Sequence, residues 1–284
     1  MNKHKVSVNG IDMVYEECGE SSGIAVILLH GFCGSSQYWH KVCPLLSNKY
    51  RIIMPQLRGH GGSSTPNGVY SMEAMADDIY KLMEQLEIDK AVMFGHSLGG
   101  YVTLAFADKY GDKLLGLGLI HSTALPDTEE VKDKRRQDID DIYENGINQY
   151  VKKLIPKLFV DSKLGKMQGE VYDIITVGLE MTAIGAIRTL EGMMQRPDRS
   201  HVLANATYPI LLVAGAEDDV ISPLDTFSIM GGGITDSTFG YPHILENTFE
   251  GVAHMSLVEV PNQLSRVIAN YLKILYEKME KRAQ

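Results

Sequence analysis

The feature that most constrains the fold is a series of short, unbroken apolar runs separated by longer segments with helical periodicity. Runs of this kind are typical of strands that are buried on both faces of a sheet. Strands that alternate with helices indicate crossover connections, so we predict an α/β fold with a mostly parallel, twisted sheet flanked by helices on both faces. The expected strands lie at 25–30, 50–55, 91–96, 114–121 and 210–215, with a weaker one at 247–252, and the clearest helices lie at 71–86, 98–109 and 260–279.

One long segment, 123–207, interrupts this alternation. It opens with the charged run PDTEEVKDKRRQDIDDIYENG and continues with amphipathic and methionine-containing stretches. A block of about 80 residues is far longer than an ordinary helix-to-strand connection. We therefore expect a helical insertion over the sheet edge, with the charged run as its solvated face. The core then comprises 1–122, which begins with a hairpin around the turn dipeptide Asn9-Gly10, and 208–284.

Charge and cysteine content limit the partners and the compartment. The net charge is -9, with 27 basic and 36 acidic residues and no basic block, so nucleic acid and anionic membranes are poor candidates as partners. The N-terminus lacks the apolar core of a signal peptide, and the run 24–29 is too short to span a bilayer. Cys18, Cys33 and Cys43 form no CxxC pair, which argues against a disulfide framework and a zinc site. We expect free thiols and a cytoplasmic protein.

The stretch Gly95-His96-Ser97-Leu98-Gly99 matches the pattern G-x-S-x-G, in which a strand turns sharply into a helix and exposes a serine. The alternative is a glycine-rich turn in which Ser97 only caps the next helix. The apolar run before the motif and the helical stripe after it favour a nucleophile.

A serine nucleophile needs a base, and the base needs an acid that orients it, in the chain order serine, acid, histidine. The expected strand 210–215 ends in Glu217, Asp218 and Asp219, and His254 follows in a loop. The other histidines fit this order or placement less well; His121, for example, precedes every acid candidate. Spacing alone does not choose among the three acids.

Several motifs together resemble the α/β-hydrolase superfamily, in its small, single-domain, serine esterase-like branch. They are HGF at 30–32, RGHGGS at 58–63, GHSLGG at 95–100, GAED at 215–218 and GVAH at 251–254, and the likeness covers roughly 23–122 and 208–275. The resemblance implies that 123–207 is a lid. It also selects Asp218 as the acid, with Asp219 as the fallback.

Attack on an acyl carbon generates an oxyanion, which requires fixed N–H donors. One is expected to be the backbone N–H of Leu98, which follows the nucleophile. The resemblance implies that the second is the backbone N–H of Phe32. One departure concerns Gln56, because relatives usually carry aspartate there, so that Arg58 would lose an ion-pair partner.

These residues predict a serine hydrolase that forms an acyl-enzyme on Ser97, most simply a carboxylesterase for a small to medium apolar ester, without a metal or organic cofactor. Lactone, thioester and C–C bond hydrolysis use the same parts, and a non-catalytic ligand receptor is the alternative of another class. A serine in the elbow excludes dehalogenases and epoxide hydrolases that use an aspartate nucleophile. Candidates for the pocket lining are Phe32, Cys33, Trp39, Leu98, Met181, Met193 and Met194.

The sequence leaves the physiological substrate, the pathway and the oligomeric state open. It also assigns no role to the long connection 227–246, which contains Gly231, Gly232 and Gly233.

Overall fold

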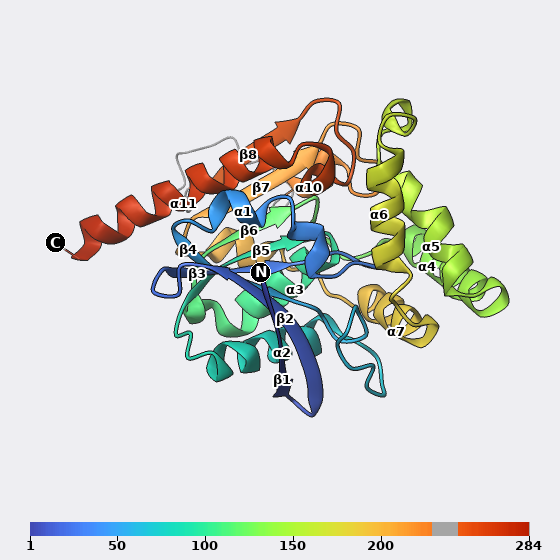
Figure 1. Ribbon diagram of the computed structural model, residues 1–284, viewed down its shortest axis with the longest axis horizontal. Helices are drawn as coiled ribbons and strands as arrows, with labels where there is room; N and C mark the ends of the chain where they lie inside the picture. The colour runs from blue at the N-terminus through green and yellow to red at the C-terminus, as the bar shows by residue number, and fades with distance from the viewer. Residues whose placement is uncertain (229–243, 284) are drawn as a thin grey trace.

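The computed structural model describes residues 1–228 and 244–283, with side chains up to residue 277. Most of the connection 227–246, including its three consecutive glycines and His243, therefore lies outside the described residues. A twisted sheet of eight strands forms the centre of the molecule, in the order β1-β2-β4-β3-β5-β6-β7-β8 (Figure 1). The strands are β1 (Asn2–Val8), β2 (Ile11–Gly19), β3 (Ile24–Leu29), β4 (Tyr50–Pro55), β5 (Ala91–His96), β6 (Leu114–Ile120), β7 (Ile210–Gly215) and β8 (Ile244–Phe249).

The sheet is parallel from β4 through β8, and the antiparallel hairpin β1–β2 extends it at one edge. The predicted turn joins the hairpin, with positive φ at both Asn9 and Gly10, as a type I′ turn requires. The last strand begins three residues earlier than predicted. It ends at Phe249, opposite Gly215 of β7, and the chain then turns through Gly251, whose φ is +66°.

Helices cover both faces of the sheet. Figure 1 shows α1 and α11 on one side and α2 and α3 on the other. The Ser71 hydroxyl caps α2 by accepting the backbone N–H of Ala74, as its position before an apolar stripe predicts. No described helix is both long enough and apolar enough to cross a membrane. The bounds are η1 (Ser36–Trp39), α1 (Cys43–Leu46), α2 (Met72–Gln85), α3 (Leu98–Tyr110), η2 (Gly111–Lys113), α9 (Pro223–Thr226), α10 (Ser256–Glu259) and α11 (Pro261–Ala283).

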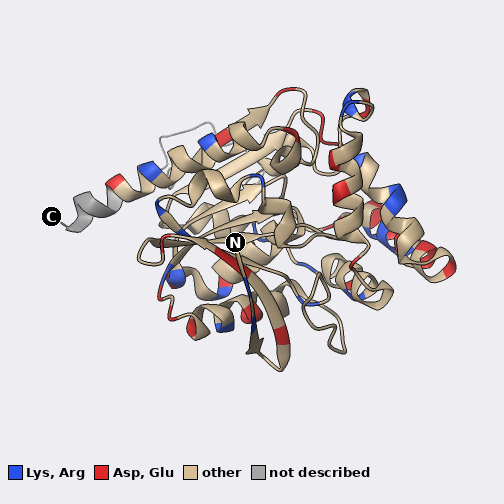
Figure 2. Ribbon diagram, viewed as in Figure 1, with Lys and Arg blue, Asp and Glu red and all other residues tan. Residues whose placement is uncertain are grey.

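Between β6 and β7 the chain forms the predicted run of helices, which gathers at one end of the sheet (Figure 1). Acidic and basic side chains are dense on α4, where the charged run lies, and of its residues only Ile142 is fully buried (Figure 2). The segment is joined to the core through backbone hydrogen bonds, such as Tyr70 N–H to Arg188 O at 3.1 Å. Its elements are α4 (Glu129–Asn145), α5 (Ile147–Leu154), η3 (Ile155–Leu158), η4 (Asp161–Lys163), α6 (Gln168–Gly178), α7 (Ala183–Met194) and α8 (Ser200–Asn205).

The expectation of three free thiols is wrong. Cys18 on β2 and Cys43 at the start of α1 form a disulfide, whereas Cys33 is free and buried. The two bonded cysteines are 25 residues apart, and they meet because α1 packs against β2. The argument from free thiols for a reducing compartment therefore no longer holds.

Candidate active site

Ser97 occupies the sharp turn between β5 and α3. Its backbone lies at φ 51° and ψ -116°, a strained conformation for a residue with a side chain. Glycine is required on both sides for steric reasons. A Cβ atom at Gly95 would lie 2.2 Å from the carbonyl oxygen of Gly99, and one at Gly99 would lie 2.5 Å from that of Leu29. The strand and helix thus pass too closely for side chains at these positions, as the motif requires.

Asp218 follows β7, and its carboxylate is fully buried. Oδ2 accepts a hydrogen bond from His254 Nδ1 at 2.8 Å, and Oδ1 accepts the backbone N–H groups of Val220 and Ile221 at 2.9 and 3.0 Å. Burial by itself would raise the pKa of this carboxyl, but charge interaction with His254 and histidine hydrogen bonds hold the pKa well below its ordinary value. Glu217 and Asp219, the other candidates, are exposed.

His254 is almost fully buried, and its main chain is held on both sides. Its N–H donates to Leu158 O in η3 at 3.0 Å, and its carbonyl oxygen accepts from His96 Nε2 at 2.9 Å. Because His96 directly precedes Ser97, this bond ties the histidine loop to the elbow. With Nδ1–H donated to Asp218, Nε2 of His254 is the basic nitrogen. The Ser97 hydroxyl makes no hydrogen bond to it in this structure, and such bonds are often long without substrate.

The HGF turn after β3 lies directly against the elbow. A Cβ atom at Gly31 would lie 3.3 Å from Ser97 Cβ and 2.6 Å from His96 Nδ1. Within the described part of the chain, the backbone N–H groups of Phe32 and Leu98 donate to no acceptor. Leu98 is the first residue of α3, where the helix dipole also favours negative charge. The predicted oxyanion donors are therefore unpaired and lie on segments that adjoin Ser97.

Other buried histidines surround these loops as neutral rings. Burial lowers the pKa of His30 to about 3 and that of His60 to about 4, and it lowers the pKa of His96 well below the ordinary value. His30 holds two segments together, since Nδ1 donates to Gly31 O at 2.8 Å and Nε2 accepts Leu57 N–H at 3.0 Å. These rings shape the site and remain uncharged at neutral pH.

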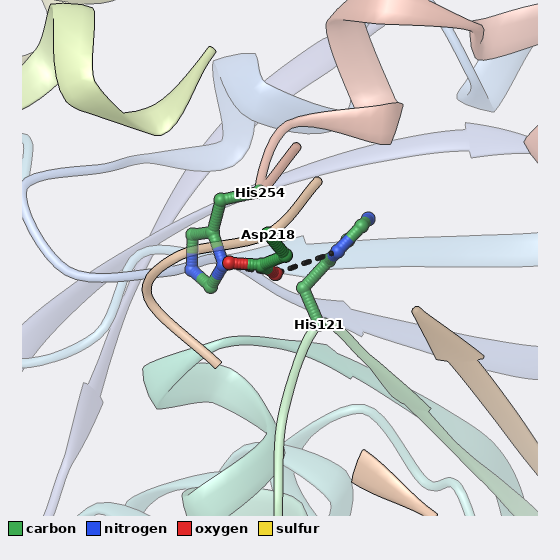
Figure 3. A group of neighbouring side chains, drawn as sticks. All are labelled: His121, Asp218 and His254. Atoms are coloured by element: carbon green, nitrogen blue, oxygen red, sulfur yellow. Dashed lines mark hydrogen bonds and ion pairs between the residues drawn. The ribbon is translucent and has the colours of Figure 1, made fainter. Parts of the chain in front are cut away.

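His121 was not predicted as a site residue, because it precedes every acid candidate in the chain. Its Nδ1 lies 3.1 Å from Asp218 Oδ2, the same oxygen that His254 contacts, and its Nε2 lies 2.7 Å from Ser256 Oγ. Figure 3 shows the two imidazoles on opposite sides of the carboxylate. Its position could have indicated that it belongs to the site, because His121 directly follows β6 as Ser97 follows β5.

Among the described residues, His121, Asp218 and His254 are also the one group whose ligand atoms are close enough to hold a metal ion, within 4.8 Å of one another. Hydrogen bonds already use these atoms, and an ion would displace the protons on both Nδ1 nitrogens. We interpret the group as hydrogen-bonded side chains.

Arg58 has an ion-pair partner although Gln56 stands where relatives usually carry an aspartate. Arg58 forms a two-armed ion pair with Asp78 of α2, with both N–O distances at 2.7 Å, so a partner replaces the missing aspartate. Gln56 itself donates to Ser36 Oγ at 2.9 Å and accepts Gly62 N–H at 2.7 Å. The amide therefore joins the loops on either side of it.

The predicted lining residues Cys33, Trp39, Met181 and Met193 are buried, and Met194 is partly buried. Cys33 lies at the boundary of core and insertion, because a Cβ atom at Gly178 in α6 would lie 3.4 Å from its carbonyl oxygen. Residues that only pack in the core are buried to the same degree, so contact with a substrate stays a prediction for these residues.

Comparison with known proteins identifies a family for this chain. The family model described as alpha/beta hydrolase fold matches residues 24–260. The malate-bound structure of a thermophilic esterase from Thermogutta terrifontis superposes with a TM-score of 0.86 and 29% identity, covering 97% of this chain and 99% of that one. An enol-lactonase from Burkholderia xenovorans LB400 superposes with a TM-score of 0.85 over 95% of this chain and 100% of that one, but at 20% identity the likeness concerns the fold alone.

Among curated proteins, a fluoroacetate dehalogenase from Burkholderia sp is 39% identical over 104 residues, which is 35% of this chain and 34% of the dehalogenase. The chain thus matches about a third of the length of this relative.

Proposed function

Since the chain belongs to the alpha/beta hydrolase fold family, we propose that it is a serine hydrolase that cleaves a small to medium, apolar carboxylic ester through an acyl-enzyme on Ser97. One observation carries the proposal. Ser97 stands in strained backbone geometry beside a loop whose histidine is hydrogen-bonded at 2.8 Å to a buried carboxylate. A nucleophile, a base and an orienting acid in this order are the parts that acyl transfer requires.

In the proposed reaction, Ser97 Oγ attacks the ester carbonyl while His254 Nε2 takes its proton. Asp218 stabilises the imidazolium that forms, and the backbone N–H groups of Phe32 and Leu98 bind the oxyanion. The tetrahedral intermediate collapses, and His254 gives its proton to the leaving alcohol. His254 then activates water, which attacks the acyl group and releases the acid and free Ser97.

The likeness to an esterase over nearly the whole chain supports ester hydrolysis. The partial likeness to a dehalogenase supports it less, because the reaction of an aspartate nucleophile with a carbon–halogen bond needs a carboxylate where this chain carries Ser97. The apolar candidates Cys33, Trp39, Met181, Met193 and Met194 are consistent with an apolar acyl or alcohol group.

The helical insertion 123–207 is proposed to act as a lid. Two contacts connect it with the site. Leu158 O accepts the backbone N–H of His254, and the Tyr150 ring of α5 packs edge-on against Phe32 with 6.3 Å between centroids. A lid that contacts both the base and the oxyanion loop is well placed to exclude water when substrate is bound.

Labelling with a fluorophosphonate probe tests the reaction class. The wild type should be labelled, Ser97→Ala should not be labelled and should lose about six orders of magnitude in kcat, and His254→Ala should be labelled far more slowly. Ser265→Ala is the control, because Ser265 is a buried serine whose hydroxyl donates to Pro261 O within α11. A folded wild type that is not labelled would contradict the proposal and favour a non-catalytic receptor.

A substrate panel tests the bond that is cleaved. Acyl 4-nitrophenyl esters of increasing chain length should be hydrolysed, with lactones, thioesters and β-diketones as the alternatives. Turnover of a β-diketone without turnover of any ester would overturn the esterase assignment while leaving the site intact.

A further inference from the structure

The carboxylate of Asp218 has more side-chain partners than the proposed triad needs. His121, at the end of β6, approaches Asp218 Oδ2 at 3.1 Å from the side opposite His254 (Figure 3). Its ring is fully buried, and its second nitrogen lies 2.7 Å from Ser256 Oγ. Ser256 begins α10, two residues after His254. Segments from three parts of the chain therefore meet at one carboxylate.

The protons in this group follow from the hydrogen bonds. An ionised carboxylate only accepts, so both Nδ1 nitrogens that contact Asp218 Oδ2 carry a proton. His121 is neutral, because burial lowers the pKa of its ring despite the hydrogen bond to Asp218. Its Nε2 must then accept, and Ser256 Oγ–H is the donor. The chain of bonds runs from Ser256 to His121 to Asp218 Oδ2, where His254 donates from the other side.

The backbone at His121 has a positive φ angle. Its φ is +50°, in the left-handed region that residues other than glycine seldom adopt, although asparagine, aspartate and histidine do so more often than the rest. The main chain is held there by a hydrogen bond from His121 N–H to Val213 O of β7 at 2.8 Å. Strain of this kind persists where the surrounding structure overdetermines it, as it does at functional sites.

The neighbouring titratable groups do not substitute for His121. The His96 ring lies 5.9 Å from that of His121 and 5.1 Å from that of His254, and its Nε2 is bonded to a backbone oxygen. Glu259 of α10 accepts the N–H of Ala253, and Lys163 donates to Gly251 O. In the described part of the chain, the two histidines are the only side chains that donate to Asp218.

We propose that His121 is a positioning residue that holds the shared oxygen of Asp218 toward His254, with Ser256 setting its tautomer. Oδ1 is fixed by two backbone N–H groups, and Oδ2 is fixed between two rings. The contact matters most when His254 becomes charged in the transition state, so its loss lowers kcat and leaves KM nearly unchanged. This role rests on the proposed serine hydrolase reaction.

The test compares His121→Leu, which removes the donor, with His121→Asn, whose amide can donate from the position of Nδ1 and which tolerates the left-handed backbone. For 4-nitrophenyl butyrate, His121→Leu should lower kcat roughly 10- to 100-fold, the range expected for a lost charge-assisted hydrogen bond, with KM changed less than about threefold. His121→Asn should recover most of that loss, and the rate of fluorophosphonate labelling should follow kcat.

A folded His121→Leu protein with wild-type kcat, or a His121→Asn protein as impaired as His121→Leu, would overturn the role. Labelling of the wild type separates the two proposals. An unlabelled wild type contradicts the serine hydrolase itself. A labelled wild type whose rate is unchanged by substitution of His121 contradicts only this inference.

Ser256→Ala decides the question if His121→Leu does not fold, because it leaves the strained residue and Asp218 in place. Without the Ser256 hydroxyl, the His121 ring is no longer restricted to the tautomer with its proton on Nδ1. The labelling rate should fall about two- to tenfold, the effect expected for a lost neutral hydrogen bond. An unchanged labelling rate would contradict the proposal.

Discussion

Two buried carboxylates, Asp218 in the core and Asp127 in the helical insertion, are held in similar ways by different partners. The side chain of each is at most 1% exposed, and each lies between two nitrogen-bearing side chains. Asp218 binds two histidines through one oxygen. Asp127 binds Arg135 at 2.6 and 3.1 Å and Arg196 at 2.6 Å.

The partners decide what each carboxylate can do. Guanidinium groups stay protonated, so the Asp127 cluster is a permanent ion network. Burial would raise the pKa of Asp127, but the two arginines hold it below its ordinary value. Arg196 also donates to Leu125 O and stacks on Tyr101 with 3.9 Å to the ring centroid. The Asp127 ion pairs therefore join segments within the insertion, and the stacking of Arg196 on Tyr101 of α3 connects them to the core. In the proposed reaction, by contrast, His254 beside Asp218 accepts and returns a proton.

The sharpest way to test this difference is Asp218→Asn. The amide keeps the shape of the side chain but favours the wrong tautomer of His254, so kcat should fall about 10⁴-fold while the protein stays folded. Steady-state kinetics with 4-nitrophenyl butyrate measures this loss, and circular dichroism checks the fold. Asp219→Asn is the matched control, because its carboxylate is exposed one residue away and the variant should retain wild-type kcat. Equal losses in the two variants would refute the assignment of Asp218.

Asp127→Ala should have the opposite profile. It leaves the buried Arg196 and the partly buried Arg135 without their carboxylate, which costs about 3–5 kcal/mol of unfolding free energy. Below the unfolding transition, kcat should fall less than about tenfold, since the cluster takes no part in the reaction. Urea unfolding measures the stability. Asp133→Ala on the same segment is the control, because its pair with Arg136 is exposed and should contribute less than about 1 kcal/mol. A kcat loss as large as that of Asp218→Asn would break the comparison.

Acid should weaken the histidine-rich core before it weakens the arginine network. Burial lowers the pKa of His30 to about 3 and that of His60 to about 4, so the unfolded chain takes up protons that the folded chain excludes. Stability is therefore full above about pH 6.5 and is lost as pH falls toward 4, by up to about 1.4 kcal/mol per pH unit for each ring. The contribution of Asp127 persists until pH falls below about 3.9, its ordinary value in an unfolded chain.

Urea unfolding between about pH 7.5 and pH 4.5 measures this slope. His60→Leu should make the slope shallower, whereas His4→Gln on exposed β1 should leave it unchanged. A slope that is the same in the wild type and in His60→Leu would show that burial of His60 does not govern acid stability.

Local patterns predicted the elements that carry the site. The strands β4, β5 and β7 have the predicted bounds, because short, mostly apolar runs with a glycine or proline at or next to their last residue leave few alternatives. The motif around Ser97 predicted the sharp turn, since the steric need for its glycines arises within the motif and against the adjacent strand, but the motif alone left Ser97 between a nucleophile and a capping serine. The last strand was placed three residues late, because its half-exposed sequence lacks a strong pattern.

Contacts between distant segments could not be predicted in this way. Cys18 and Cys43 were expected to be free, and they meet only because α1 packs on β2. Arg58 was expected to lose its usual ion-pair neighbour, and Asp78, 20 residues away on α2, takes that place. His121 was set aside because it precedes the acid in the chain, although hydrogen bonding depends on distance in space.

By itself, the sequence determined the α/β alternation, the elbow and the presence of an acid and a histidine downstream, because each depends on neighbours along the chain. The tertiary structure decided the partners of those groups. Parallel pairing of β6 with β7 places the ends of both strands at the same edge of the sheet, so His121 and Asp218, 97 residues apart, share a hydrogen bond. The physical reason is that register and packing bring together side chains whose separation along the chain carries no signal of contact.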